Sequence, residues 1–154
     1  MRCAVKWLTA LVLMFAPSAM ASTSLKSALV EAYQDELNAY MRYESIIQQF
    51  GDIRPFSNLV GAEERHMNLL EQIFKLHGWS PLKIYHPVAQ FYSSVLSACD
   101  ASLEAEESNV AMYDRLVKDI SDEEAIAVFL HLRQASAERH IPALQRCAGL
   151  RLPE

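Results

Sequence analysis

The chain has 154 residues, of which 51% are apolar and 21% charged, and it carries a formal charge of −5 at pH 7. This composition excludes disordered, collagen-like and disulfide-dense proteins and fits one globular domain. With only 4 glycines and few segments rich in Val, Ile or Thr, the sequence favours helices over strands. The acidic charge and the lack of any Lys/Arg block argue against a nucleic-acid partner.

The first 21 residues have the pattern of a secretory signal peptide. Arg2 and Lys6 form a basic start, residues 7–16 are mainly apolar, and Ala19-Met20-Ala21 matches an A-x-A cleavage site. An uncleaved anchor is the weaker alternative, because a bilayer span needs about twenty apolar residues. Cleavage after Ala21 would leave residues 22–154 as a periplasmic or secreted domain without stable membrane insertion. The leader contains two basic and no acidic residues, so its loss changes the formal charge from −5 to −7.

Cleavage also removes Cys3, so that Cys99 and Cys147 are the only thiols of the mature chain. An even number of cysteines in an oxidising, exported compartment is typical of disulfide-bonded proteins. We therefore expect a disulfide between these two residues.

The mature chain divides into helical stretches separated by short breaks. The first stretch covers residues 24–50 and is stopped by Gly51-Asp52. A second begins after Ser57-Asn58, either of which can cap it, and ends near Gly78. Residues 82–90 then predict a longer, irregular connection.

The third stretch spans about residues 91–120, and Ser121-Asp122-Glu123-Glu124 has the pattern of an N-cap followed by acids in the first turn of a fourth helix. Pro142 lies inside that fourth helix. Because proline removes a backbone hydrogen bond, we expect a kink or an end near Ile141. The sequence thus predicts an all-α four-helix bundle with one longer connection between helices 2 and 3.

Spacings of three and four mark an apolar seam on each helix, and a few polar residues interrupt these seams. They are Glu36 on the first helix, Glu63 and His66 on the second, and Glu106 on the third. The seam of the fourth helix contains Arg133 and His140 and runs through Ile126, Leu130, Arg133, Ala137, His140, Leu144 and Cys147.

The antiparallel register of two helical hairpins aligns these residues. A first hairpin centred near Phe50 and Gly51 places Glu36 opposite Glu63 and His66. A second hairpin centred at Glu123 places Glu106 opposite His140, and the same register places Cys99 opposite Cys147 about two turns away. The expected disulfide and the polar residues therefore support one alignment.

Three carboxylates and two imidazoles in a bundle core need a compensating charge, because bare buried carboxylates are costly and repel one another. A metal ion supplies that charge, and mixed carboxylate and imidazole ligands suit iron, manganese or zinc. One Glu from each of two helices with Glu-x-x-His from the others is the plan of di-iron carboxylate bundles. We expect a metal, with iron favoured, bound by Glu36, Glu63, His66, Glu106 and His140.

At these residues the chain resembles the ferritin-like superfamily, and more closely the bacterial ferritin-like proteins of the 2202-type domain of unknown function. The resemblance covers about residues 30–147 and is strongest at Phe56-Ser57-Asn58-Leu59 and Ala62-Glu63-Glu64-Arg65-His66-Met67, supported by residues 106–110 and by Ser136 before His140. It implies the same five metal ligands.

One position departs from the ferritin-like pattern. The second Glu-x-x-His should place Glu three residues before His140, where this chain has Ala137. Glu138 is one position away, turned by about 100° around the helix. The site is thus one carboxylate short, which leaves open a single metal, an asymmetric pair or an inactive site. Arg133 could add a positive charge near the cluster.

Several alternatives remain at the level of sequence. Glu63 and His66 could be an exposed i,i+3 pair, and Asp35 and Glu107 compete with Glu36 and Glu106 as ligands. We interpret the remaining histidines, His77, His86 and His131, as ordinary surface or core residues. The tyrosines Tyr33, Tyr40, Tyr43 and Tyr113 are expected to pack in the core, with a role beside the metal as the minority interpretation.

Two functions fit this pattern. The first is an exported metal-binding protein with ferroxidase, peroxide-handling or oxygen-handling activity, as the resemblance implies. The second is a non-catalytic bundle with a degenerate or structural metal site that binds another envelope protein. A homodimer is compatible with either function, and whether the protein is an enzyme stays open.

Overall fold

The computed structural model describes residues 24–79 and 88–149. Within these two ranges the chain forms helices and no strands, which confirms the expected all-α four-helix bundle. None of the described helices has the length and apolarity to cross a membrane. The predicted signal peptide, His86 and most of the predicted connection at residues 82–90 lie outside the described residues.

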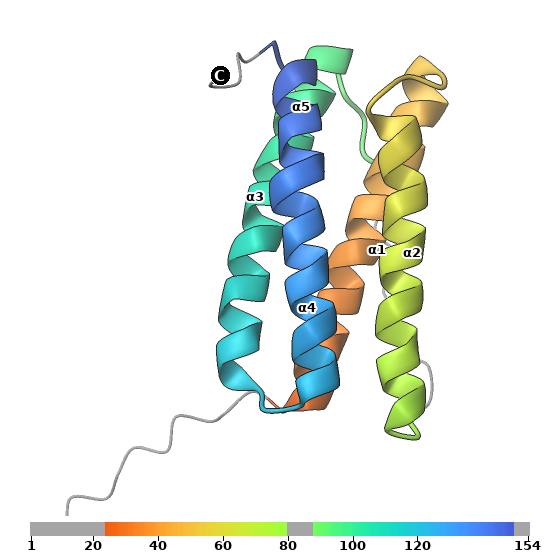
Figure 1. Ribbon diagram of the computed structural model, residues 1–154. Coiled ribbons are helices and arrows are strands. Elements are labelled where there is room, and N and C mark those ends of the chain that lie inside the picture. Colours follow the sequence, from red (N-terminus) through yellow and green to blue (C-terminus); the bar gives the residue numbers. More distant parts are fainter. Residues whose placement is uncertain (1–23, 80–87, 150–154) are drawn as a thin grey trace, which may run out of the picture.

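Two helical hairpins make up the bundle (Figure 1). The first consists of α1 (Leu25–Phe50) and α2 (Phe56–Leu76). The second consists of α3 (Val95–Asp119) and a continuous helical arm built from α4 (Glu123–Ala135), the π-helical turn η1 (Ser136–His140) and α5 (Ile141–Cys147). Helix α3 begins at the end of the bundle opposite to the end of α2, so α2 and α3 run parallel (Figure 1). The longer connection therefore lies between helices 2 and 3, as predicted.

Local side-chain chemistry explains most helix ends. The Ser24 hydroxyl accepts a hydrogen bond from the Ser27 amide at the start of α1, and Gly51, with a φ of 89°, ends that helix. Helix α3 begins later than expected, because Ser94 and Ser97 form a reciprocal capping box there. Asp122 caps α4, with Glu123 and Glu124 in its first turn, as the acidic pattern predicted.

The predicted cap of α2 is wrong. Helix α2 starts at Phe56 after Pro55, and neither Ser57 nor Asn58 caps it through its side chain. The Ser57 amide donates to the carbonyl of Ile53, and the Asn58 amide donates to that of Pro55. Because backbone carbonyls already satisfy the first amides of α2, no side-chain cap is needed.

The interruption expected near Pro142 is a π-helical turn, and the helix continues beyond it. In η1 the Ile141 amide donates to the Ser136 carbonyl, five residues earlier. Pro142 then lies in the first turn of α5, where its missing N–H disturbs little. A π turn contains one more residue than an α-helical turn. The side chains before it are therefore rotated around the helix axis relative to those after it.

This phase shift corrects the predicted seam of the fourth helix. The prediction assumed one unbroken α-helix from Ile126 to Cys147. The predicted buried positions are correct at His140 and Leu144. Before the π turn, the buried positions lie one residue earlier than predicted, at Ala125, Phe129, Leu132 and Ser136 in place of Ile126, Leu130, Arg133 and Ala137.

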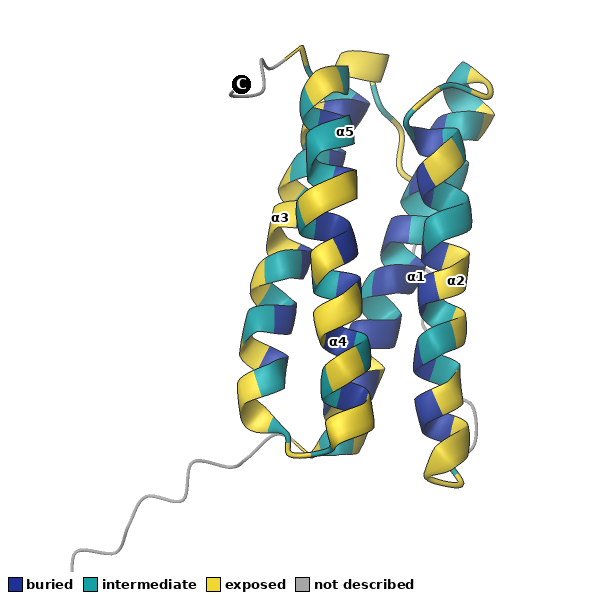
Figure 2. Ribbon diagram, viewed as in Figure 1, coloured by how far each residue is buried: buried dark blue, intermediate teal, exposed yellow. Residues whose placement is uncertain are grey.

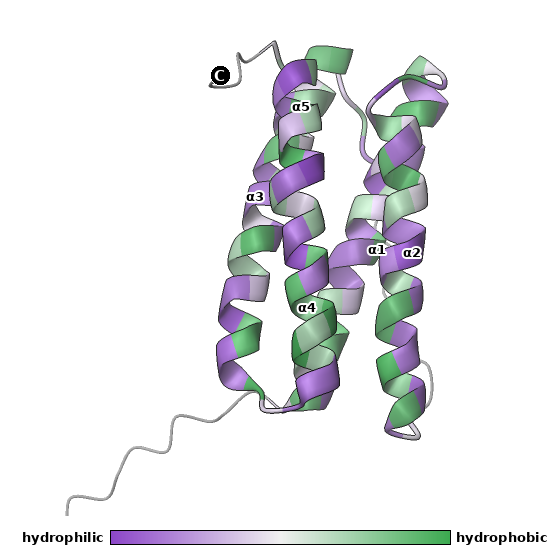
Figure 3. Ribbon diagram, in the orientation of Figure 1, coloured by the Kyte–Doolittle hydropathy of each residue, from purple (hydrophilic) through white to green (hydrophobic). Residues whose placement is uncertain are grey.

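Two apolar clusters fill the bundle, and a layer of buried polar side chains separates them. The buried residues lie on the faces that the helices turn toward one another (Figure 2). The first cluster includes Leu29, Phe74, Tyr113 and Phe129, and the second includes Ile46, Phe56, Cys99 and Leu144. Hydrophilic and hydrophobic residues alternate along each helix, as amphipathic helices require (Figure 3). The polar layer consists of buried side chains from all four arms of the bundle.

The predicted disulfide is present. Cys99 of α3 and Cys147 of α5 are linked, with their Cα atoms 5.8 Å apart. This bond ties the two arms of the second hairpin together at the end of the bundle away from the α3–α4 turn. It confirms the predicted register of that hairpin and is compatible with an extracellular location.

Candidate metal centre

The structure brings the five predicted ligands together in the polar layer. Each of the four helical arms contributes at least one of them, and the exposed fraction of every residue is 5% or less: Glu36, Glu63, His66, Glu106 and His140. The two carboxylates that competed with them in the sequence lie elsewhere: Glu107 is exposed, and Asp35 lies at the edge of the layer. The exposed-pair interpretation of Glu63 and His66 is wrong, because both side chains are buried.

The five side chains form two triads that share Glu63. In the first, Nδ1 of His66 lies 3.0 Å from Oε2 of Glu36 and 2.9 Å from Oε2 of Glu63. In the second, Nδ1 of His140 lies 3.2 Å from Oε1 of Glu63 and 3.3 Å from Oε2 of Glu106. In each triad the candidate ligand atoms lie within 4.8 Å of one another, so each triad could hold a metal ion.

The two imidazole rings face each other across this arrangement. Their centroids are 5.4 Å apart and the rings are nearly parallel, with an interplanar angle of 17°. Both rings direct Nδ1 toward the carboxylates. The two triads are therefore similar in composition, each with its own Glu and His and one shared carboxylate.

Two tyrosines hold the outer carboxylates in place. The hydroxyl of Tyr113 donates to Oε1 of Glu36 at 2.6 Å, and that of Tyr43 donates to Oε1 of Glu106 at 2.5 Å. Each bond leaves Oε2 of the same carboxylate directed toward a histidine. This arrangement supports the minority interpretation of these tyrosines as neighbours of the site. Tyr33 and Tyr40 instead donate to Glu71 and Glu44, outside the layer.

Sequence reasoning missed Asn109. Its Nδ2 donates to Oδ2 of Asp35 at 2.7 Å and lies 3.3 Å from Oε1 of Glu36, while its Oδ1 accepts a bond from the Ser136 hydroxyl at 2.9 Å. Asn109 thus connects α1 and η1 behind the cluster. Asn109 lies three residues after Glu106 and four before Tyr113, and this helical spacing is the signal that could have found it.

Two expectations for the second hairpin are corrected. Because of the π turn, Ser136 and not Ala137 takes the buried position one turn before His140, so a hydroxyl and not a methyl group lies there. Glu138 is exposed, as expected. Arg133 adds no charge to the cluster, because its guanidinium pairs with Asp114 at 2.6 and 3.1 Å on the outside of the bundle.

The electrostatics of the cluster favour two charged imidazoles in the absence of metal. Burial lowers the pKa of His66, but its hydrogen bonds to Glu36 and Glu63 outweigh burial and raise that pKa to about 9. The same balance, with Glu106 and Glu63 as partners, raises the pKa of His140 to about 10. Burial raises the pKa of Glu36, while bonds to both histidines keep that of Glu63 below its usual value.

The remaining described histidines lie outside the cluster. His77 pairs with Asp122 at 3.1 Å and stacks on Trp79, and His131 is exposed. Neither belongs to a group of residues that could hold a metal. This agrees with their interpretation as ordinary residues.

The comparisons with known proteins support the fold alone. No model of a known protein family matches the chain, and no curated protein matches it. Among solved structures, a hypothetical protein from Methanococcus jannaschii DSM 2661, MJ0754, is similar to this chain with a TM-score of 0.73. The two are 16% identical, and the alignment covers 84% of each chain.

Proposed function

We propose that this protein is an exported, ferritin-like metal-binding protein whose Glu–His cluster binds iron, with manganese or zinc as alternatives. One observation carries the proposal: two ligand triads meet at Glu63, whose buried Oε1 makes no regular hydrogen bond and has Nδ1 of His140 3.2 Å away. A bound cation would satisfy this oxygen and offset the charge of the three buried carboxylates.

The donor set fits such a metal. Three carboxylates and two imidazoles offer the mixed oxygen and nitrogen ligands that iron, manganese and zinc accept. Glu63 would be a ligand in both triads, Glu36 and His66 would complete the first, and Glu106 and His140 would complete the second. Tyr113 and Tyr43 each occupy one oxygen of an outer carboxylate and so orient the other toward the ion, as residues around metal ligands commonly do.

We further propose a ferroxidase-type or peroxide-handling activity. When bound, iron supplies the electrons for such chemistry. The chain's own residues bind the ion and fix the orientation of the ligands. The histidine side opens to a cavity, through which a small reactant can approach the cluster.

Metal analysis of protein purified without chelators tests the binding proposal. We expect stoichiometric metal in the wild type and loss of all metal in Glu63→Gln, because this substitution affects both triads. Glu106→Gln should lose only the metal of the second triad. Glu107→Gln is the matched control, since this neighbouring carboxylate is exposed, and it should retain the wild-type content. A wild type that carries no metal, and whose melting temperature does not rise with added iron, manganese or zinc, would contradict the proposal.

Activity requires its own measurement. We expect the wild type to consume oxygen or peroxide in the presence of ferrous iron, and Glu63→Gln to do so no faster than the buffer. Equal rates for the two proteins would reject the ferroxidase proposal and leave metal binding to be judged by metal analysis.

A further inference from the structure

A cavity of about 630 Å³ opens on the histidine side of the cluster, between α2 and the arm formed by α4, η1 and α5. His66 and His140 line it, and both direct Nδ1 away from it, toward the carboxylates. The ring edges that carry Nε2 are therefore left toward the cavity. The cavity therefore reaches the histidine side of the cluster.

The lining of this cavity combines apolar side chains with polar and basic ones, in an otherwise acidic protein. It contains Arg65, Arg139, three histidines and the amides of Asn58, Asn68 and Gln72, and it contains no Asp or Glu. The whole chain carries a formal charge of −5. Charge complementarity at this cavity therefore favours an anion, even though the protein as a whole repels one.

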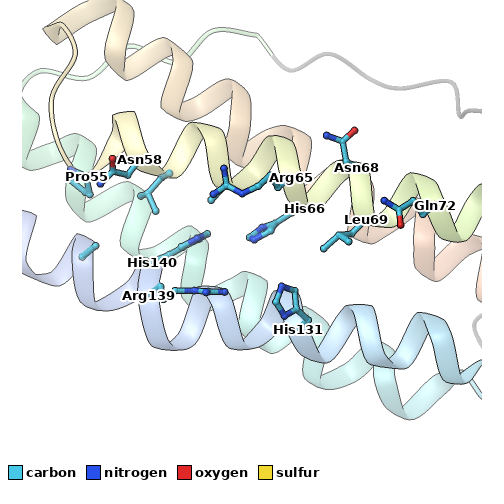
Figure 4. A pocket seen from close by; sticks show the side chains of 13 residues that line it. Pro55, Asn58, Arg65, His66, Asn68, Leu69, Gln72, His131, Arg139 and His140 are labelled. Carbon is cyan, nitrogen blue, oxygen red and sulfur yellow. The ribbon is translucent and has the colours of Figure 1, made fainter.

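Arg65 and Arg139 come from the two helical arms that face each other across the cavity, and the rings of His66 and His140 lie between them (Figure 4). Neither guanidinium has a hydrogen-bond or ion-pair partner within residues 24–79 and 88–149, whereas Arg115 pairs with Glu31 and Arg133 pairs with Asp114. The Arg65 guanidinium lies along its own helix, beside Gly61, which has no side chain. Both arginines thus retain their full capacity to bind an oxyanion.

We propose that this cavity binds a small oxyanion, a carboxylate or phosphate compound, between Arg65 and Arg139. Guanidinium groups match the planar geometry of two oxygens of such an anion, and the asparagine and glutamine amides can donate to the remaining ones. The bound anion would lie beside the histidines and on the opposite side of their rings from the carboxylates. This site does not depend on a metal being bound.

Calorimetric titration of the metal-free protein tests the proposal, with succinate as the carboxylate probe and inorganic phosphate as the phosphate probe. We expect single-site binding of at least one probe, and the tighter of the two identifies the chemical class. Arg65→Gln and Arg139→Gln should each weaken that binding at least tenfold. Both arginines are exposed, so neither substitution should affect folding, which circular dichroism checks.

Arg146→Gln is the matched control, because Arg146 is an exposed arginine of α5 that does not line the cavity. Its binding should stay within twofold of the wild type. The proposal is overturned if neither probe binds, or if Arg146→Gln weakens binding as much as the cavity variants do. Since the titration uses metal-free protein, its failure would leave the metal proposal intact, and failure of metal analysis would leave this site intact.

Discussion

Individual side chains balance the charge of the polar layer. With both imidazoles protonated, the two positive charges of His66 and His140 oppose the three carboxylates of Glu36, Glu63 and Glu106. The hydrogen bonds between these groups explain how a bundle core tolerates them without a bound ion. A metal would replace the imidazolium protons, because ligating histidine must be neutral.

This balance predicts how the stability of the metal-free protein depends on pH. Both histidines have a folded-state pKa, about 9 and about 10, above their ordinary value of 6.5. The two protonated histidines make their full contribution to the free energy of unfolding below pH 6.5. This contribution is lost as the pH rises toward 9 and 10. The free energy of unfolding, measured by urea denaturation, should fall across this range by on the order of 3–5 kcal/mol for each of the two histidines.

His66→Gln provides the comparison for this pH dependence. The variant lacks one of the two titrating groups, so its unfolding free energy should fall less steeply between pH 6.5 and 9. An unchanged slope in the variant would show that the dependence comes from other groups.

The tyrosines that hold the outer carboxylates allow a second test. Tyr113→Phe removes the shorter of the two hydrogen bonds to Oε1 of buried Glu36 and leaves only the longer one from Asn109, which should destabilise the metal-free protein by about 1–3 kcal/mol. It should also weaken metal binding roughly 10–100-fold, as loss of a residue that orients a ligand commonly does. Tyr33→Phe is the control, since the hydroxyl of Tyr33 bonds the partly exposed Glu71 outside the cluster. Equal losses for the two variants would contradict the role of Tyr113.

Much of the site was predictable at this scale. A glutamate in an apolar seam is rare enough to stand out, so the five cluster residues could be named from spacing alone. Asn109 and Ser136 could not be named in the same way, because an uncharged polar residue in a seam is commonplace. Their role depends on bonds to Asp35 and to each other, which only the packed structure provides.

At the scale of the element, the π turn decides which residues of the last arm face the cluster. Pro142 gave a signal that the helix is irregular there, but no sequence pattern indicated a wider turn in place of a break. The seam from Ile126 to Ala137 was wrong by one residue for this reason, and Arg133 was assigned to the core by the same error. The first three helices lack such a turn, and their polar residues lie where the spacing placed them.

The π turn predicts that creating a second Glu-x-x-His motif in the sequence will not add a ligand. Ala137→Glu would create Glu-x-x-His, but position 137 is turned away from the cluster. We expect its metal content, measured by elemental analysis, to equal that of the wild type. A gain of metal in this variant would contradict the orientation of the turn.

The disulfide is the main covalent restraint on the whole molecule. Cys99 and Cys147 are 48 residues apart in sequence, so their link restricts the unfolded chain considerably. Cys99→Ala with Cys147→Ala should lower the free energy of unfolding by about 2–4 kcal/mol, as measured by chemical denaturation. Reduction of the wild type should have a similar effect. A stability equal to that of the oxidised wild type would contradict this expectation.

The division of the ligands between the two hairpins imposes an order on assembly. All residues of the first triad lie within residues 36–66, in the hairpin that is synthesised first. The second triad combines two residues of the later hairpin with Glu63 of the earlier one. One half of the centre can therefore form before the rest of the chain is made, whereas the other half exists only after the hairpins have docked.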